Sequence, residues 1–444
     1  MSSETSELKL WLKARPSLTG GAEADVKVLA GYVEAGCGLL HALGPKPSRS
    51  GEQLQAAKLI HETSRLLRRQ FLALHREWIY HVLTHGLTVR KTLRELAFEA
   101  ANLCAGLLPT SEQIAWERTH LQINKEGFEI DQGLFFHALL GSPRIGAHLI
   151  ESARQPTVRA LDLIDSFRNE GHLDLGSVTI ERQGCAACLT MNNGACLNAE
   201  DDRLIDDMET AVDLALLADN VKVGVLRGGI MTHPRYAGRR VFSAGLNLKA
   251  LRAGQISFVE FILRRELGYI NKIVRGLLLD DESVEGNKNL APQRTLEKPW
   301  IAAVDSFAIG GGAQLLLIVD SVIAASDSYF SLPAAHEGIV PGFSNQRLTR
   351  FLGSRKSRQA ILGGRKIWAH EPDAQLLVDE VVGAGDLDAA IEHHIHQLNG
   401  PAVVANRHML NLAEEPLPTF LLYAAEFALV QAERLYSEDV LGKT

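Results

Sequence analysis

The sequence predicts an α/β domain that is preceded by an all-helical N-terminal domain and followed by C-terminal helices. A chain of 444 residues is too long for one ordinary core and indicates two domains or three. Apolar residues recur at helical spacing up to about residue 170, and beyond Gly171 short β-rich runs alternate with helical segments. We therefore expect a helical domain at residues 1–172 and an α/β domain at 173–444, with helices again from about residue 385.

The composition is that of a soluble globular protein. Apolar residues make up 46% of the chain and charged residues 22%. The net charge of −7 argues against a dedicated nucleic-acid binder. The longest apolar run, "AQLLLIVDSVIAAS", is interrupted by Asp320, so no membrane span is expected. The start "MSSETSELKLWLKARP" lacks the apolar core of a signal peptide, and we expect a cytoplasmic protein.

The cysteines and histidines do not predict a metal site. Five cysteines are few and odd in number, which argues against a disulfide framework. Cys185-Ala-Ala-Cys188 has the spacing of half a zinc or redox motif, but no second pair follows, and two packed core thiols in a hairpin are the favoured interpretation. The "HHIH" run at 393–396 also lacks a second ligand cluster, so we expect it on a helix surface.

The elements follow one another in the order that the fold class requires. "LIHETSRLLRRQFLALHREWIYHVL" and "TLRELAFEAANLCAGLL" are amphipathic helices, and "LLPTSEQIAWE" marks a break and a new helix start. "SVTIERQ", "ACLTMN", "VKVGVLRG" and "PWIAAVDS" are strands, and "DDRLIDDMETAVDLALLAD" is a helix between them. We interpret the helical half as a bundle that serves packing or assembly, and its residue pattern does not indicate a catalytic site.

Two glycine-bearing turns are the informative features of the α/β half. The first is "VFSAGLNLKAL" at 241–251, where a strand is expected to run into a helix, and the second is "KPWIAAVDSFAIGGGAQLLL" at 298–317. An amide N–H at the start of a helix is unpaired. Two such donors that converge would form an oxyanion hole, which stabilises negative charge on a carbonyl oxygen. Either turn alone is equally well explained as a tight strand-to-helix junction.

Together and in this order, the two turns resemble the crotonase (enoyl-CoA hydratase/isomerase) superfamily over about residues 175–385. "FSAGLNLKAL" is similar to the family's Phe-x-Ala-Gly-x-Asp-Leu segment, with Asn247 in place of the usual aspartate. "LNAEDDRLIDDM" and "YFSLPAAHEGIVPG" match two further family segments. The resemblance implies a crotonase-like ββα spiral core and an acyl-CoA thioester as ligand.

The resemblance also implies which residues meet the thioester. The oxyanion donors would be the amides of Leu246 and Gly311. The residues beside them in the two turns would contact the substrate; these are Ala244, Gly245, Asn247 and Gly310.

Two positions depart from the hydratases of this family, which use two glutamates to handle water. Here those positions hold Gln314 and Ala334. A neutral amide cannot act as a general base, and alanine is inert. Hydration of an enoyl-CoA is therefore not expected.

Two charged residues take apolar positions instead. Glu200 stands where the family has a leucine or methionine that faces the acyl pocket; the alternative is an exposed acid at a helix start. Arg265 lies on the apolar face of "SFVEFILRRELGYINKIV", whereas Arg264 lies on the polar face. The alternative for Arg265 is a snorkelling side chain, whose aliphatic part covers the hydrophobic core while its guanidinium reaches solvent. A carboxylate and a guanidinium in one pocket would bind a substrate with fixed hydroxyl groups.

These departures narrow the resemblance to one branch, the 3,5-dihydroxyphenylacetyl-CoA 1,2-dioxygenases of glycopeptide-antibiotic biosynthesis, which also carry a helical N-terminal domain. The branch implies an enolate that reduces O2 directly, with 3,5-dihydroxyphenylglyoxylate and free CoA as products. It implies no metal and no organic cofactor, since CoA is part of the substrate and O2 is the co-substrate. In this interpretation Gln314 orients the thioester or the oxygen species. The superfamily also implies a homotrimer or a dimer of trimers.

Other assignments stay open at this level. The loop "THPRYAGRR" at 232–240 places His233, Arg235 and Tyr236 where they could meet CoA, although a solvated loop explains it equally well. His336 and Glu337 are weak candidates for removing the α-proton. The segment 280–295 is polar and expected to be mobile. The alternative functions are another aryl-CoA enzyme (a thioesterase, isomerase or decarboxylase) and an inactive acyl-CoA-binding scaffold.

Overall fold

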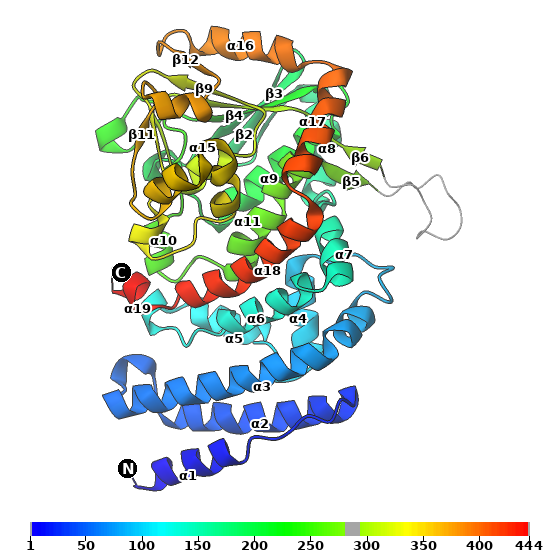
Figure 1. Cartoon of the computed structure of the whole chain (residues 1–444), viewed down its shortest axis with the longest axis vertical. Helices are drawn as coiled ribbons and strands as arrows, with labels where there is room; N and C mark the ends of the chain where they lie inside the picture. The colour runs from blue at the N-terminus through cyan, green and yellow to red at the C-terminus, as the bar shows by residue number, and fades with distance from the viewer. Residues whose placement is uncertain (1, 280–293, 443–444) are drawn as a thin grey trace.

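The N-terminal part of the chain is helical, as expected. A computed structural model describes residues 2–279 and 294–442 (Figure 1). Thr110 caps the helix predicted at "LLPTSEQIAWE", and its hydroxyl accepts from the Gln113 amide. The first eight α-helices are α1 Ser2–Lys13, α2 Ala22–Ala42, α3 Gly51–Leu83, α4 Leu93–Leu103, α5 Ser111–Arg118, α6 Glu129–Leu140, α7 Pro143–Ala153 and α8 Val158–Glu170.

A seven-stranded sheet in the order β1-β2-β3-β4-β7-β9-β12 forms the centre of the α/β part. The edge strands β1, β2 and β3 pair antiparallel, and every later neighbour is parallel. Strands β4 and β7 are almost wholly buried, as expected for a sheet covered on both faces. The strands are β1 His172–Asp174, β2 Val178–Gln183, β3 Ala186–Met191, β4 Val223–Gly228, β7 Trp300–Val304, β9 Ser321–Ala325 and β12 Glu380–Val382.

Smaller elements surround this sheet. A second sheet has the order β11-β10-β8, and β5 pairs with β6. The strands of the second sheet are β8 Phe307–Ile309, β10 Tyr329–Ser331 and β11 Ile367–Trp368, while the β5–β6 pair is Leu277–Leu279 and Arg294–Leu296. The helices of this half are α9 Asp202–Leu217, α10 Leu248–Arg252, α11 Arg264–Leu267, α12 Tyr269–Arg275, α13 Gly311–Leu315, α14 Ala334–Glu337, α15 Ser344–Ile361, α16 Leu387–Leu398, α17 Pro401–Glu414, α18 Leu417–Arg434 and α19 Glu438–Leu441.

The helix predicted around Arg265 is not continuous. Residues Phe258–Leu263 form a π-helical turn, α11 follows, and the backbone breaks at Gly268 before α12 begins. A Cβ at Gly268 would lie 2.4 Å from the carbonyl oxygen of Arg264, so the break requires glycine. π turns are rare and often mark functional sites. The expected faces of the two arginines are nevertheless confirmed, because Arg265 is buried and Arg264 points away from it.

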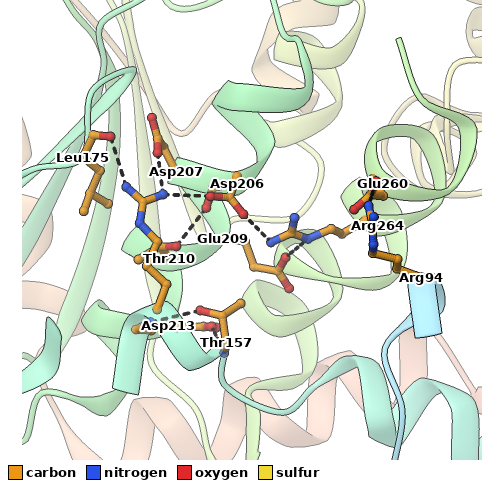
Figure 2. A network of polar contacts seen from close by, with 12 residues as sticks. Arg94, Thr157, Leu175, Asp206, Asp207, Glu209, Thr210, Asp213, Glu260 and Arg264 are labelled. Atoms are coloured by element: carbon orange, nitrogen blue, oxygen red, sulfur yellow. Dashed lines mark hydrogen bonds and ion pairs between the residues drawn. The ribbon is translucent and has the colours of Figure 1, made fainter. Parts of the chain in front are cut away.

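A polar network holds Arg264 on the opposite side (Figure 2). Its guanidinium contacts Asp206 at 2.9 Å and Glu209 at 2.5 Å, both on α9. Arg159 of α8 reaches the same helix and contacts Asp206 at 2.8 Å and Asp207 at 2.7 Å. The acidic face of α9 therefore joins the last N-terminal helix to α11.

The C-terminal helix α18 packs along α6 and lies between the helical part and the α/β part (Figure 1). Small residues allow the close approach: a Cβ at Gly133 would lie 2.6 Å from that of Ala432. The Tyr436 hydroxyl donates to Glu129 Oε2 at 2.5 Å, while Oε1 of Glu129 accepts from the Phe258 amide at 2.8 Å. The N-terminal helices are thus tied both to the C-terminal region and to the π turn before Arg265.

Three expectations from the sequence need correction. Cys185 and Cys188 belong to a hairpin as predicted, but both thiols are free and only half-buried because they lie near its turn. His394 is buried in α16, where it bonds to Ser321 at 2.7 Å, so only part of the histidine run lies on the helix surface. The strand expected at 241–244 is reduced to one bridge, between Ser243 and Ala308.

Other expectations stay predictions. The first strand begins at His172, so the predicted division after residue 172 falls inside β1. Most of the segment 280–295 lies outside the described residues. In the described ranges, no helix is long and apolar enough to cross a membrane, and the cytoplasmic location is untested.

The buried carboxyl of Glu117 makes the stability of the helical part pH-dependent. It accepts from the amides of Gly127 at 2.8 Å and Phe128 at 3.1 Å. Burial raises the pKa of Glu117 from 4.5 to about 7, and the carboxylate of Glu129 adds to the rise. Below pH 4.5 the carboxyl is protonated in both the folded and the unfolded state, and between pH 4.5 and 7 only the folded state keeps the proton.

We therefore expect the contribution of Glu117 to the free energy of unfolding to fall as the pH rises from about 4.5 to 7, by about 3 kcal/mol at most. Denaturant titrations of the wild type and Glu117→Gln across this range measure it. The free energy of unfolding of the wild type should fall relative to that of the variant as the pH rises, by about 3 kcal/mol at most. Parallel profiles would contradict the raised pKa.

Candidate active site

A cavity of about 130 Å³ lies where the two glycine-bearing turns meet α11, the segment 333–342 and α18. An engineered apolar cavity of about 150 Å³ in another protein holds benzene, so this space suits one aromatic ring. Its apolar lining comes from Ala244, Leu246, Leu248, Phe261, Ile262, Ile309, Pro333, Ala334, Ile339, Val340, Pro341 and Phe427. Its polar lining comes from Glu200, Arg265, Glu266, Gln314, Glu337 and Gln431.

The two turns lie against each other, as the oxyanion hypothesis requires. The Ile309 amide donates to the Ser243 carbonyl at 2.9 Å. Gly245 has φ +80°, and a Cβ there would lie 2.9 Å from the amide nitrogen of Gly311. Only glycine permits both this backbone conformation and this contact.

The amides of Leu246 and Gly311 are available for a ligand. Neither N–H has a hydrogen-bond acceptor within residues 2–279 and 294–442. The amides of the adjacent residues are paired, in contrast. The Asn247 amide donates to the Glu200 carbonyl at 2.8 Å, and the Gly310 amide donates to the Ser331 carbonyl at 2.8 Å. Two unpaired donors on adjoining turns at one cavity can stabilise an oxyanion.

Arg265 and Glu200 form a buried ion pair in the cavity wall. The guanidinium Nε donates to Glu200 Oε2 at 2.8 Å, and Nη2 donates to Oε1 at 3.0 Å. The side chains are 4% and 2% exposed. Burial alone would lower the pKa of Arg265, but Glu200, and then Tyr269 and Glu266, raise it above its ordinary value. The exposed and snorkelling alternatives for these two residues are therefore wrong.

The remaining donors of Arg265 bind three other groups. Nη1 donates to Glu266 Oε1 at 2.8 Å and to Gln314 Oε1 at 2.7 Å. Nη2 also donates to the Gly311 carbonyl at 2.8 Å. All five N–H bonds of the guanidinium are thus used by the protein itself.

The glycine triplet has a reason that the sequence did not reveal. A Cβ at Gly311 would lie 2.2 Å from Glu200 Oε2, and one at Gly312 would lie 2.7 Å from the Cβ of Ser243. Gly310 has φ +52°. The triplet therefore makes room for the Glu200–Arg265 pair and for the first turn, besides leaving the Gly311 amide accessible.

Five predicted substrate residues do not line the cavity: Gly245, Asn247, His233, Arg235 and Tyr236. Asn247 caps α10 by accepting from the Ala250 amide at 3.1 Å. His233 accepts from the Arg235 amide, and Arg235 lies over the Tyr236 ring at 5.6 Å. The Tyr236 ring contacts Phe307 at 5.5 Å, next to Ala244 and Ile309 of the cavity. Their role toward CoA stays a prediction.

The two candidates for α-proton removal are separated by the structure. Glu337 is half-buried and lines the cavity one helical turn after Ala334. His336 is exposed and lies against Gly364. Of these two, only Glu337 reaches the cavity.

Among the cavity residues that sequence reasoning missed are Glu266, Phe427 and Gln431. Glu266 directly follows Arg265, and its place in the cavity wall depends on the π turn and the break at Gly268. Phe427 and Gln431 come from α18, which packing brings back to the site. A run of residues at helical spacing gives no signal for such a long-range contact.

Comparison with known proteins places the chain in a family. Residues 280–417 match the family described as enoyl-CoA hydratase/isomerase. A (3,5-dihydroxyphenyl)acetyl-CoA 1,2-dioxygenase of Amycolatopsis orientalis is 52% identical over 96% of this chain and 97% of its own. A short-chain-enoyl-CoA hydratase of Clostridium acetobutylicum is 30% identical over 48% of this chain and 72% of its own. The chain therefore belongs to the crotonase (enoyl-CoA hydratase/isomerase) superfamily, and its α/β part has the crotonase fold.

The matches differ in how much of the chain they cover. The solved enoyl-CoA hydratase of Mycobacterium avium subsp. paratuberculosis is 22% identical, with a TM-score of 0.49, and covers 61% of this chain and 98% of its own. The match to the dioxygenase relative extends over nearly the whole chain, so it includes the N-terminal part.

Within the described residues, no group of three or more histidine, cysteine, aspartate or glutamate side chains is arranged to hold a metal ion.

The crowding at Gly311 gives a testable prediction. Gly311→Ala should push Glu200 from Arg265 and lower the free energy of unfolding by about 1–3 kcal/mol, as other overpacked sites do. Gly385→Ala is the matched control, because a Cβ there meets nothing within 4 Å, and it should stay within about 0.5 kcal/mol of the wild type. Denaturant titration measures both. Equal values for the two variants would contradict the crowding.

Proposed function

We propose that this protein is a dioxygenase that converts 3,5-dihydroxyphenylacetyl-CoA and O2 to 3,5-dihydroxyphenylglyoxylate and free CoA. The observation that carries the proposal is the buried Glu200–Arg265 pair at a ring-sized cavity beside two unpaired amides. The relative of the same activity, at 52% identity over nearly the full length, supports it. The place in glycopeptide-antibiotic biosynthesis is part of this proposal.

The reaction begins at the α-carbon, which lies between the thioester and the ring. Loss of one α-proton gives an enolate, and the amides of Leu246 and Gly311 stabilise its oxygen. The enolate transfers one electron to O2, and recombination forms the α-peroxide. The peroxide attacks the thioester carbonyl and expels CoA as its thiolate. Cleavage of the O–O bond with loss of the second α-proton then leaves the keto acid, which holds both atoms of O2.

The lining of the cavity suits this chemistry and not hydration. Gln314 and Ala334 occupy the positions of the two water-handling glutamates, and neither can act as a general base. The apolar side chains around the amides exclude water, which would otherwise return a proton to the carbanion. The substrate supplies the electrons, so we propose a reaction without metal or organic cofactor.

The proposed reaction is tested by recording dissolved oxygen and free thiol together. Chelator-treated protein mixed with 3,5-dihydroxyphenylacetyl-CoA should consume O2 and release thiol in equal amounts, at the rate of untreated protein. Thiol release without oxygen uptake would instead identify a thioesterase. Neither signal would leave an isomerase, a decarboxylase or a binding scaffold, which product analysis separates.

We also propose that α17 joins copies of this chain into a trimer or a dimer of trimers. Within the described part of the chain, Arg407 is the only residue of α17 that is buried. Met409, Leu410 and Leu412 are 60%, 59% and 53% exposed, which is unusual for neighbouring apolar residues on one short helix. Their burial against another copy would remove this apolar surface from water.

The assembly is tested by light scattering after size exclusion. The wild type should have the mass of three or six chains. The double variant Met409→Glu, Leu410→Glu should shift to the mass of one chain, because charges cannot be buried at such a contact. Leu54→Glu, on the exposed side of α3, should keep the wild-type mass. A monomeric wild type at micromolar concentration would rule the assembly out.

A further inference from the structure

The first step of the proposed reaction, removal of an α-proton, has no residue assigned to it. A side chain that accepts this proton must belong to the polar lining of the cavity, which consists of Glu200, Arg265, Glu266, Gln314, Glu337 and Gln431. A guanidinium and two neutral amides are not proton acceptors at neutral pH. The choice therefore lies among the three carboxylates.

Glu200 and Glu266 compensate the charge of a buried cation. Both oxygens of Glu200 accept from Arg265, at 2.8 and 3.0 Å, and Oε1 of Glu266 accepts from the same guanidinium at 2.8 Å. Oε2 of Glu266 has no hydrogen-bond partner in the described ranges, but it lies 4.0 Å from Nη1 of Arg347. A proton on either carboxylate would leave buried guanidinium charge less well compensated, which is costly. These two side chains are therefore suited to staying ionised.

Glu337 is the cavity carboxylate that stands outside this network. Within residues 2–279 and 294–442, its side chain makes no hydrogen bond and no ion pair. It is half-buried, whereas the side chains of Glu200 and Glu266 are 2% and 3% exposed. A proton taken up by Glu337 would break no contact of the folded chain and would leave no buried cation uncompensated.

The backbone around Glu337 is held firmly at the cavity. Helix α14 ends at this residue, and Gly338 turns the chain with φ +82°. A Cβ at Gly338 would lie 2.7 Å from Cγ2 of Val440, so the turn requires glycine. Arg434 of α18 donates to the Gly338 carbonyl at 2.6 Å. Residues on both sides of the turn line the same cavity; these are Pro333, Ala334, Ile339 and Val340.

The place of Glu337 suits a group that acts on the α-carbon. The cavity has room for one ring and not for CoA, so the thioester must leave it on the side that is open to solvent. The α-carbon lies between the ring and the thioester. A half-buried carboxylate lies nearer to that side than the fully buried pair does. Ala334 lies three residues earlier on the same helix face, and its small side chain leaves space beside Glu337.

We propose that Glu337 is the catalytic base that removes the first α-proton. This rests on the proposed function and deepens it. The Cα–H bond breaks, its proton passes to a carboxylate oxygen of Glu337, and its electron pair becomes part of the enolate, whose oxygen binds the amides of Leu246 and Gly311. The thiolate of CoA that is expelled later takes up one proton, so the proton on Glu337 can pass to it and the carboxylate is restored.

The first experiment separates proton removal from the reaction with O2. 3,5-Dihydroxyphenylacetyl-CoA is incubated with the enzyme in D2O without oxygen, and the exchange of its α-protons is followed by NMR. The wild type should exchange them, and Glu337→Gln should do so about 100- to 10,000-fold more slowly, which is the usual contribution of a general base. The matched control is His336→Gln, an exposed neighbour on the same helix, which should keep the wild-type rate.

Oxygen uptake and binding complete the test. The kcat/KM of Glu337→Gln should fall by about the same factor, while the dissociation constant of an unreactive CoA thioether should stay close to the wild-type value, because the substitution preserves the size of the side chain. Formate should restore exchange by Glu337→Ala in proportion to its concentration, which a variant that had lost its fold would not show.

The outcomes distinguish the two proposals. Exchange by Glu337→Gln at the wild-type rate, or a loss of exchange in Glu266→Gln alone, would overturn the role of Glu337. A wild type that exchanges α-protons but consumes no O2 would refute the proposed function and leave the role of Glu337 in place. A wild type that does neither would refute both. If the wild type consumes O2 without measurable exchange, an unchanged kcat/KM in Glu337→Gln would overturn the role of Glu337.

Discussion

The guanidinium of Arg265 is the interaction on which the rest of the site depends. It is buried and bound to groups from separate parts of the chain: Glu200 before α9, Glu266 on its own helix, and Gly311 and Gln314 on α13. Taking charges out of water is costly unless every partner stays in place. Because the Gly311 carbonyl bonds to Arg265 while its amide is unpaired, one residue connects the buried charges to the proposed oxyanion site.

The same constraint explains why the site contains a glutamine. Glu200 and Glu266 already place two carboxylates on one guanidinium. A glutamate at position 314 would bring a third anion to the same cation and would leave at least one of them poorly compensated. An amide supplies the needed acceptor without charge. In the proposed function, the absence of a water-handling acid and the stability of the buried charged wall therefore depend on the same residue, Gln314.

Much of this could be predicted from the sequence because it depends on local backbone. The two turns and the inward face of Arg265 follow from glycine content and spacing, whereas the pocket position of Glu200 was implied by the resemblance to the family. The reason for Gly311 could not be predicted, since its Cβ meets Glu200, which lies far earlier in the chain. Glu266 was missed because the π turn and the break at Gly268 alter the helical phase, and periodicity assumes a continuous helix.

The packing of α18 on α6 makes the chain's two ends mutually dependent. Phe427 and Gln431 of α18 close the cavity on one side, and the neighbouring Ala428 and Ala432 of that helix rest on α6. A chain trimmed to the crotonase core would keep every residue of the two turns but would leave this wall without its support. Minimal versions of the enzyme should therefore be sought by shortening α1 to α3, which lie beyond α4 to α6 on the side away from α18 (Figure 1), and not by removing the helical part as a block.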